Sequence, residues 1–325
     1  MKAIRAALAV CAVSVGMAAV NADAQNAQNY PTHPVKIVLP FPPGGGTDTV
    51  SRILLDPLGK KLGHPFVMDY KPGGNTVIGT NAAVQAAPDG YTLLTTLDMS
   101  ATILPAVYSK LPFDPQKQLT PVGVLATVPA LLAVNPKVPA QNLKELIAYD
   151  KANPGKLNYG SAVLHGQLFG EALKLASGLQ YTYVPYKGSA EAVQALAGGH
   201  IDMLFIDIAT GINFIKDGRI RAITITVAER HPTLPDVQTL REAGFPGLEM
   251  SVWYGLFAPT GTPSAIIEKL NAGLQEVGND SSIKKRLADL GHEVSTLKPD
   301  QIKELIRKDS ANWAKAAAAG NIKLD

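Results

Sequence analysis

The sequence predicts an α/β protein with two domains, and three observations lead to this prediction. The chain has 325 residues, which is more than one hydrophobic core usually accommodates. Short apolar runs rich in β-branched residues, such as residues 35–39 and 91–96, are followed by Gly, Ser or Asp and then by helical periodicity. That order is typical of buried parallel strands with helices on both faces. Two further apolar segments are suited to carry the chain between the domains.

The first of these segments, residues 121–135, carries almost no charge and is predicted to be one buried strand that leaves the first domain. The second, residues 250–258, is again extended and apolar and returns to it. We therefore expect a hinge near Val128 and Trp253. Trp253 and Tyr254 are interpreted as hinge packing, with cleft lining as the alternative. The predicted boundaries are residues 25–127 plus 253–325 for domain 1 and residues 128–252 for domain 2.

The remaining strands and helices follow the same alternation. Pro263 suits the first turn of a helix, and the sequence after it predicts helices and no further strand, packed back on the first domain. The predicted helices lie at residues 49–62, 167–176, 190–197, 264–277, 281–290 and 299–317, and the other predicted strands at residues 157–160, 181–186, 201–206 and 220–227.

The first 24 residues read as a signal peptide. Lys2 and Arg5 precede the apolar residues 6–20, and Ala22-Asp23-Ala24 offers a cleavage site with small residues. Residues 1–24 are therefore predicted to be removed, which places the mature protein in the periplasm. Cys11 is the single cysteine of the chain and lies in this leader, so the mature protein is predicted to contain no disulfide. A lipid anchor on Cys11 is the alternative, but it would leave almost no apolar region before the cut.

Charge and motifs exclude several function classes. The formal net charge is +3, and no basic stripe is present, so nucleic acid is not an expected partner. The six histidines are scattered rather than spaced as paired ligands, so no metal site is expected. The glycine-rich segment described next lacks the Lys and Ser or Thr of a phosphate-binding loop and the spaced glycines of a dinucleotide fingerprint. No cofactor is expected.

A glycine-rich segment, Pro-Pro-Gly-Gly-Gly-Thr-Asp, follows the first predicted strand. Three glycines before a helix let the backbone approach a ligand and turn its N–H groups toward it, an arrangement that favours anions. The alternative is a tight turn in which the aspartate caps the helix. The candidate ligand-binding residues in this segment are Pro42, Gly44, Gly45, Gly46, Thr47 and Asp48.

Other strand ends also carry small or polar residues. Ligands in open α/β sheets bind outside the carboxyl ends of the strands, next to helix N-termini. Asp207 follows an apolar strand and is predicted either to orient the polar end of a ligand or to cap the next helix. The candidate ligand-binding residues at these strand ends are Ser100, Ser161, Ala162, His165, Ser189 and Asp207.

Ser161 and His165 also raise the question of catalysis. Ser161 stands between a predicted strand and helix, where it is suited to cap the helix or to hold a carboxylate. A nucleophile elbow requires Gly-x-Ser-x-Gly, whereas residues 159–163 read Tyr-Gly-Ser-Ala-Val, and no acid completes a triad. An exported hydrolase that uses Ser161 and His165 therefore remains only the alternative, and no catalytic residue is predicted.

Several segments together resemble the periplasmic substrate-binding receptors of tripartite tricarboxylate transporters, also called Bug receptors. The resemblance covers nearly the whole mature chain, and its motifs are specific in combination. They are Tyr30-Pro31, residues 40–48, Ala87-Pro88-Asp89-Gly90-Tyr91-Thr92, Asn158-Tyr159-Gly160-Ser161, Val184-Pro185-Tyr186-Lys187-Gly188, Leu234-Pro235-Asp236-Val237, Glu242-Ala243-Gly244 and Ala258-Pro259-Thr260-Gly261-Thr262-Pro263.

The resemblance implies a type II periplasmic-binding-protein fold, with two α/β domains joined by two crossing strands around a ligand cleft. It also implies that the ligand is a small carboxylate, held by residues 42–48 and by the loop after Ser161. In the family, the receptor delivers its ligand to a two-component membrane permease. A monomer suits such a diffusing receptor. A ligand-sensing subunit for a membrane kinase would use the same cleft and is a further alternative.

Two departures from the family pattern fall on the second domain's side of the expected cleft. The segment after Ser161 is about two residues shorter than usual by unaligned comparison, and Gln167 stands where the family has a histidine. A frequent Phe-Asp-Asn is Phe205-Ile206-Asp207 here, so the acid is displaced by one position and is expected on the other face of the strand. These changes affect the expected ligand rather than the expected fold.

Overall fold

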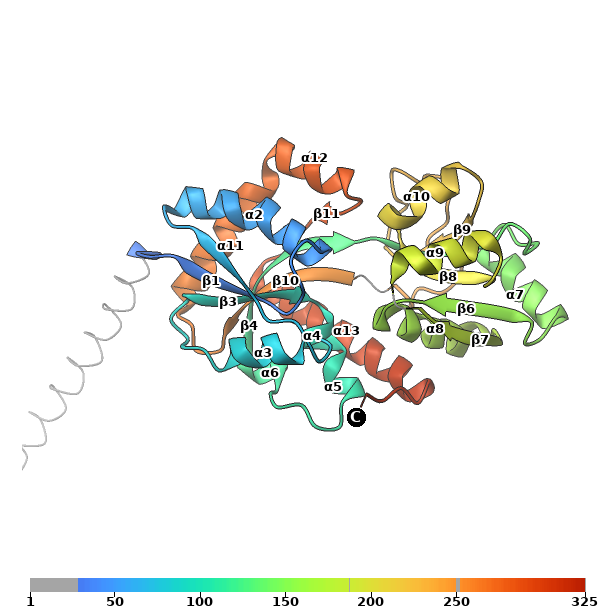
Figure 1. The fold of residues 1–325 in the computed structure, drawn as a ribbon, viewed down its shortest axis with the longest axis horizontal. Helices are drawn as coiled ribbons and strands as arrows, with labels where there is room; N and C mark the ends of the chain where they lie inside the picture. Colours follow the sequence, from blue (N-terminus) through green and yellow to red (C-terminus); the bar gives the residue numbers. More distant parts are fainter. Residues whose placement is uncertain (1–28, 187, 250–251, 325) are drawn as a thin grey trace, which may run out of the picture.

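The computed structural model of the chain describes residues 29–186, 188–249 and 252–324 and consists of two lobes, each built around its own β-sheet (Figure 1). The predicted signal peptide, residues 1–24, and Cys11 lie outside the described residues. The predicted α/β fold class with two domains is confirmed. The predicted domain boundaries stay a prediction.

The sheet of the first lobe has the strand order β11-β4-β10-β3-β1-β2. β1 pairs in parallel with both β2 and β3, whereas β10 is antiparallel to β3 and β4. The predicted parallel strands are present, and the sheet is mixed because the strand that returns from the second lobe runs in the opposite direction. The strands are β1 (Val35–Leu39), β2 (Phe66–Tyr70), β3 (Thr92–Leu97), β4 (Leu119–Val128), β10 (Val252–Pro259) and β11 (Glu293–Val294).

The sheet of the second lobe has the order β7-β6-β8-β5-β9. β6 is parallel to β7 and β8, and β5, the strand that enters from the first lobe, is antiparallel to β8 and β9. These strands are β5 (Ala130–Val134), β6 (Leu157–Ser161), β7 (Tyr181–Pro185), β8 (Met203–Asp207) and β9 (Arg221–Ile225).

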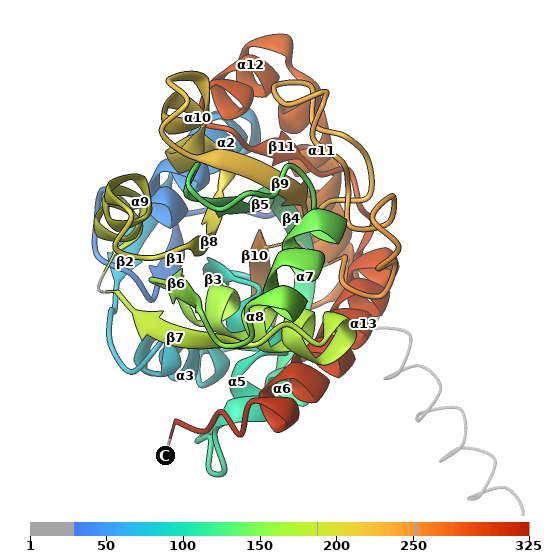
Figure 2. The ribbon, with the colours of Figure 1, turned by 90° about the vertical axis from the view of Figure 1, so that its right-hand side faces the viewer.

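Helices cover both sheets, and the last helix touches both lobes. α13 (Pro299–Ala319) packs against α4, α5 and β4 of the first lobe, as predicted, and also against α8 of the second (Figure 2). The other helices are α2 (Gly46–Leu62), α3 (Val77–Val84), α4 (Met99–Thr102), α5 (Leu104–Val107), α6 (Pro115–Gln118), α7 (Leu143–Ala152), α8 (Leu164–Ser177), α9 (Ser189–Gly198), α10 (Ile208–Lys216), α11 (Ser264–Asn279) and α12 (Ser281–Asp289).

β1 illustrates why these strands read as continuous apolar runs. Val35, Ile37 and Leu39 face one core, which they share with α2 and α11. Val38 faces the opposite core, which contains Trp253. Because both faces of the sheet are covered, the sequence shows no alternation of polar and apolar residues.

The strands differ from the sequence prediction in three places. The single strand expected at residues 121–135 is two strands, β4 and β5, which belong to different sheets and are separated by Pro129. Proline lacks the N–H that a continuous strand would use. β2 was not predicted; it is a short edge strand, and of its five side chains only Phe66 is buried. β11 adds a short strand where none was expected.

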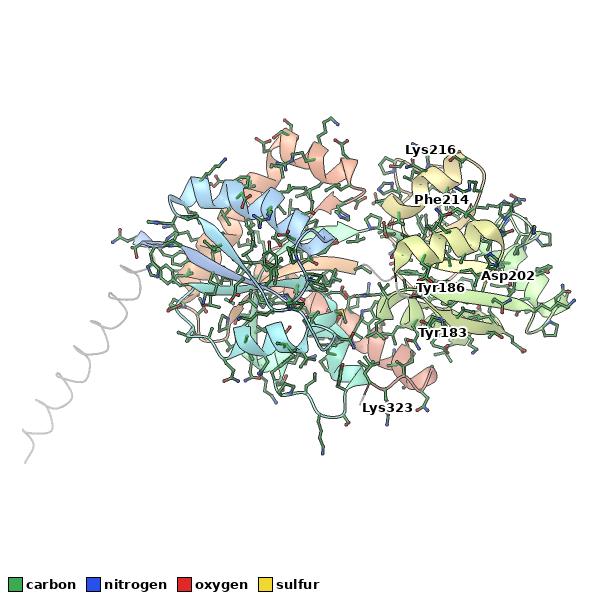
Figure 3. All side chains as sticks on the ribbon, viewed as in Figure 1. Tyr183, Tyr186, Asp202, Phe214, Lys216 and Lys323 are labelled. Carbon is green, nitrogen blue, oxygen red and sulfur yellow. The ribbon has the colours of Figure 1, made fainter. Side chains whose placement is uncertain are left out.

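The second lobe presents several aromatic side chains toward its surface. Tyr183 on β7 and Phe214 on α10, both labelled in Figure 3, are only partly buried, and each packs against an apolar core. The Arg219 guanidinium carbon lies 4.7 Å from the centre of the Phe214 ring. Tyr183, Phe214 and Arg219 do not line the cavity described next.

Candidate functional site

A cavity of about 350 Å³ lies between the two lobes and is lined by side chains from both. Its walls are mostly apolar, and a few polar residues are placed among them. This composition is typical of a site for a small organic ligand. The lining residues are Phe41, Asn75, Leu97, Met99, Val128, Ala130, Ala162, Val163, Leu164, His165, Ser189, Ala192, Leu204, Phe205, Ile206, Asp207, Val252 and Tyr254.

The glycine-rich segment follows Phe41, which lines the cavity from the first lobe, whereas none of residues 42–48 is itself among the lining residues. Residues 42–46 are exposed, and Gly44 has φ +83°, a left-handed conformation that glycine adopts at little cost. α2 begins at Gly46 without a side-chain hydrogen bond to its first turn. Thr47 is buried within that turn. The exposed N-terminus of α2 is therefore open to an anionic ligand group.

Asp48 holds the glycine-rich segment in place rather than facing the cavity. Its carboxylate accepts the Gly44 N–H at 2.9 Å, Arg52 Nε–H at 3.0 Å and the Tyr70 hydroxyl at 2.9 Å. Burial raises the pKa of Asp48, but the bonds from Gly44, Tyr70 and Arg52 outweigh it and lower that pKa below its usual value. The ionised carboxylate therefore fixes the start of the segment and leaves the helix N-terminus free.

Tyr254 connects the glycine-rich segment to the cavity. Its side chain lines the cavity, and its hydroxyl lies against Gly46, where an added Cβ would stand 2.6 Å from the Tyr254 oxygen. Gly46 is therefore required by this close approach. Tyr254 is buried in the core of the first lobe and also lines the cavity, whereas Trp253 is fully buried and does not line it. β10 turns alternate side chains to opposite faces, so the two neighbours have different roles.

The second lobe supplies four of the predicted residues to the cavity wall: Ala162, His165, Ser189 and Asp207. Ser189 is the first residue of α9. Asp207 caps α10: its two carboxylate oxygens accept the Thr210 N–H at 2.7 Å and the Thr210 hydroxyl at 2.8 Å. The predicted helix cap at Asp207 is confirmed, and because Asp207 also lines the cavity, its contact with a ligand stays a prediction.

Ser161 and His165 do not form a catalytic pair. The Ser161 hydroxyl donates to the Val163 carbonyl at 2.8 Å and accepts the Val163 N–H at 3.2 Å. His165 Nε2 lies instead 2.9 Å from Asp98 Oδ1. Ser161 is 1% exposed and does not line the cavity. It stabilises the turn between β6 and α8, and the geometry of a hydrolase is not present at these two residues.

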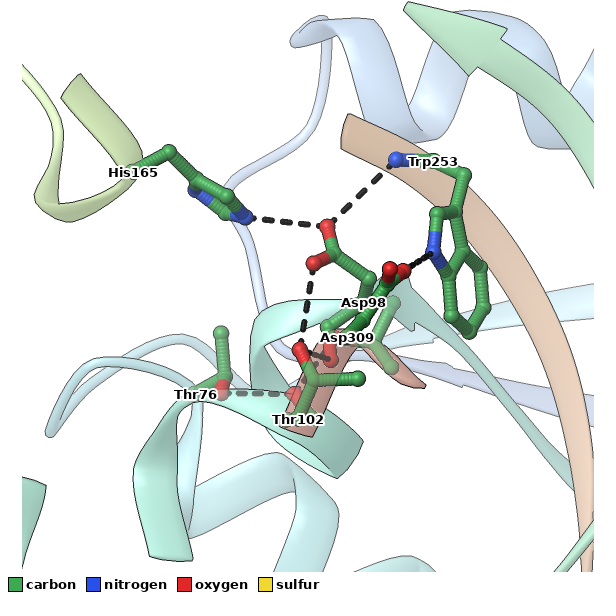
Figure 4. Close-up of polar contacts among 8 residues, drawn as sticks. Thr76, Asp98, Thr102, His165, Trp253 and Asp309 are labelled. Atoms are coloured by element: carbon green, nitrogen blue, oxygen red, sulfur yellow. Dashed lines mark hydrogen bonds and ion pairs between the residues drawn. The ribbon is translucent and has the colours of Figure 1, made fainter. Parts of the chain in front are cut away.

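His165 belongs to a buried polar cluster where the lobes meet (Figure 4). Asp98, at the end of β3, also accepts the Thr102 hydroxyl at 3.1 Å and the Trp253 N–H at 3.4 Å. Trp253 Nε1–H donates to Asp309 at 3.0 Å. Burial is the main cause of the raised pKa of Asp309, which is about 7; the bond from Trp253 works against this rise, and the charge of Asp98 contributes to it. This cluster joins β3, β10 and α13 to α8 of the second lobe.

Ser100 lies away from the cavity. It is fully buried, and its hydroxyl bonds to the hydroxyls of Thr76 at 2.8 Å, Thr96 at 2.7 Å and Thr80 at 3.3 Å. A ligand contact from Ser100 is not supported by this position. Its hydroxyl ties β3 to α3 and to the turn before it.

Sequence reasoning missed most of the apolar wall and one polar residue, Asn75. Asn75 has φ +49° and follows Gly73 and Gly74, and its amide donates to the Tyr108 hydroxyl at 3.1 Å. A Gly-Gly-Asn turn between a strand and a helix was a signal that could have identified it. Phe41, beside the glycine-rich segment, was a second available signal. In the sequence, Leu204 and Ile206 indicate only a buried strand and not a cavity wall.

The described residues contain no cluster of three potential metal ligands.

The two lobes touch at a second place, where Gly291 of the first lobe lies against Ala209 of α10. Across the described ranges, no helix has both the length and the apolar character needed to cross a bilayer.

The comparisons with known proteins agree on one family. A family model described as "Tripartite tricarboxylate transporter family receptor" matches residues 50–321. Protein BugT of Bordetella pertussis is 34% identical over 322 residues, which cover 98% of this chain and 98% of BugT.

Two solved structures from Rhodopseudomonas palustris are similar over almost their whole length. Rpa4515 with adipate is 32% identical, with a TM-score of 0.76, and the match covers 90% of this chain and 99% of that one. MatC with bound malate is 32% identical, with a TM-score of 0.72, and the match covers 88% of this chain and 99% of that one. By its sequence and by its fold, the chain belongs to the tripartite tricarboxylate transporter receptor family.

Proposed function

We propose that this protein is a periplasmic solute receptor that captures a small organic carboxylate and delivers it to a two-component membrane permease. The observation that carries the proposal is the cavity between the lobes, whose first-lobe side adjoins the uncapped N-terminus of α2. A helix N-terminus favours a carboxylate through its free N–H groups and its dipole. Adipate and malate in the two R. palustris relatives support the same ligand class.

The proposed receptor uses its lobes as two binding domains. Domain 1 comprises residues 25–127 plus 253–325 and contributes the glycine-rich segment, and domain 2 comprises residues 128–252 and contributes Ser189 and Asp207. Residues 1–24 are the export signal, and the mature protein acts as a monomer. The separation of Ser161 from His165 supports a receptor without catalytic activity.

Isothermal titration calorimetry tests this function on the mature protein after its export to the periplasm. The panel contains aliphatic mono-, di- and tricarboxylates, aromatic carboxylates and amino acids. The proposal predicts saturable binding of at least one acid at one site per chain, and no change in the ligand recovered afterwards. Absence of binding across the whole panel, or chemical conversion of a bound acid, contradicts it.

The matching control uses the methyl ester or primary amide of the acid that binds best. Either derivative keeps the carbon skeleton and removes the negative charge. Because the proposed contact is between an anion and a helix N-terminus, both should bind at least about tenfold more weakly than the acid. Equal affinity for the acid and its amide argues against a carboxylate receptor.

A further inference from the structure

We infer that the preferred ligand is dipolar, with a carboxylate at one end, an apolar body, and an amine or other hydrogen-bond donor at the other end that meets Asp207. The inference rests on the proposed function and narrows it from carboxylates in general to amino-carboxylates with an apolar body. Its basis is the chemistry of the cavity walls and the position of their single acid.

The walls favour an apolar body. Leu97 and Met99 from the first lobe face a cavity that Leu204, Phe205 and Ile206 close from the second. A hydroxyl-rich body would lose its hydration there with few polar partners in return. An alkyl or aromatic body would gain from the same transfer.

Tyr254 lies near both polar groups of the proposed site, the N-terminus of α2 and the Asp207 carboxylate. Its hydroxyl lies against Gly46, the first residue of α2, so the anion-binding helix N-terminus adjoins this side chain. Burial, and secondly the charge of Asp207, raise the pKa of Tyr254 to about 12. The Asp207 carboxylate is therefore close enough to act on the same ring. Tyr254 therefore neighbours both the N-terminus of α2 and the Asp207 carboxylate.

Asp207 has capacity for a ligand donor. Each of its carboxylate oxygens accepts one bond, both from Thr210. An ionised carboxylate offers about four acceptor positions, so lone pairs remain for a group in the cavity. Asp207 is partly exposed and forms part of the wall.

A second ligand carboxylate would meet the wrong charge at this position. In the described part of the chain, which leaves out Lys187, no Lys or Arg lines the cavity. The far carboxylate of a dicarboxylate would therefore approach the Asp207 carboxylate with no lining Lys or Arg to offset its charge. Two carboxylates that share one cavity repel each other. An ammonium at the same end would be attracted instead. The site thus discriminates between two ligands of equal length by the group at their far end.

Three matched ligand series test this inference by calorimetry. Each series keeps the chain length and changes only the far end: butanoate, 4-aminobutanoate and succinate; pentanoate, 5-aminopentanoate and glutarate; hexanoate, 6-aminohexanoate and adipate. At the length that binds best, the amino acid should bind at least about tenfold more tightly than the diacid, with the plain acid in between.

Asp207→Asn is the decisive variant. The asparagine oxygen can still accept the Thr210 N–H and cap α10, so the fold should persist while the charge is removed. The variant should lose most of the preference for the amino acid and bind the diacid more tightly than the wild type does. Asp280→Asn is the matched control, because Asp280 also caps a helix, through Ser282 and Ile283, and does not line the cavity. It should leave the preference unchanged.

The outcomes separate this inference from the proposed function. A diacid or plain acid that binds best, or a preference for the amino acid that survives Asp207→Asn, overturns the dipolar ligand and leaves the carboxylate receptor intact. If no carboxylate binds, either in these series or in the wider panel, both the dipolar ligand and the carboxylate receptor are contradicted. Preference for the amino acid that depends on Asp207 supports both.

Discussion

Asp98 and His165 are 67 residues apart in the chain and are joined by a hydrogen bond of 2.9 Å between Oδ1 and Nε2. Asp98 directly follows β3 in the first lobe, and His165 lies in the first turn of α8 in the second. Both side chains are almost completely buried. The bond therefore fixes the two lobes against each other beside the cavity. Trp313 of α13 packs edge-on against the same imidazole, with ring centres 5.6 Å apart.

The first prediction is that Asp98 and His165 stabilise the protein as a pair. Removal of one partner leaves the other buried without compensation, so His165→Ala should lower the free energy of unfolding by about 3 kcal/mol. In a double-mutant cycle with Asp98→Ala, the coupling energy should exceed about 1 kcal/mol. Urea denaturation followed by circular dichroism measures both values.

The exposed ion pair between Arg307 and Glu304 on α13 is the control for this cycle. Solvent screens that pair, so its cycle should show no measurable coupling. Additive effects of the Asp98 and His165 substitutions would contradict the stabilising role of the buried pair.

The second prediction concerns pH and Asp309. Its pKa is raised to about 7 in the folded protein, chiefly by burial, so between about pH 4 and pH 7 the folded state binds more protons than the unfolded state. The stability contributed by this group is therefore complete at the acidic end of that range and is lost as the pH rises through about 7. The pKa of this carboxyl is also raised by the charge of Asp98 and lowered by Lys308 and His165.

Asp309→Asn tests that dependence, because an asparagine oxygen can still accept the Trp253 Nε1–H. Thermal unfolding at several pH values between 4 and 7.5 measures the slope. The variant should lose less stability than the wild type as the pH rises across this range. Parallel curves for the two proteins would show that Asp309 does not titrate there.

The third prediction uses two neighbouring glycines as a matched pair. Gly46→Ala should weaken ligand binding at least about tenfold, because the new Cβ would displace the Tyr254 hydroxyl that lies 2.6 Å from its position. Gly45→Ala should bind normally, since the nearest atom to its Cβ is the Pro42 carbonyl oxygen at 3.8 Å and its φ is −78°. Calorimetry with one ligand compares the two variants. Equal effects would indicate that Tyr254 does not define the site.

The fourth prediction separates a receptor from a hydrolase. Ser161→Ala removes a hydroxyl that bonds only to the backbone of Val163 among the contacts described. The substitution should lower stability by about 1 kcal/mol and leave ligand affinity within about threefold, or roughly 0.6 kcal/mol. Any esterase activity of the wild type that disappears in this variant would contradict the assignment as a receptor.

The parts of the site that sequence analysis predicted have local causes. The exposed turn at Gly44 follows from glycines placed between a buried strand and a helix, although α2 begins at Gly46 rather than at the predicted residue 49. The cap at Asp207 has the same origin, because an acid after an apolar strand is a typical helix start. Such features depend on neighbouring residues and leave a pattern in the sequence.

The parts that were missed depend on contacts between distant segments. Nothing near His165 in the sequence indicates that its partner is Asp98, and nothing near Tyr254 indicates that its hydroxyl meets Gly46. The division of residues 121–135 into β4 and β5 was signalled by Pro129, but the run of apolar residues on either side concealed it. Which apolar residues face the cavity follows from how the two lobes pack, which no local pattern specifies.

A crystal structure of the mature protein with its tightest-binding acid is the most direct test of ligand capture between the lobes. We expect the ligand in the cavity, with one carboxylate within hydrogen-bond distance of the N–H groups at the start of α2 and its body against Tyr254 and Phe205. A ligand bound elsewhere on the protein, or one in the cleft with its carboxylate turned away from α2, would contradict it.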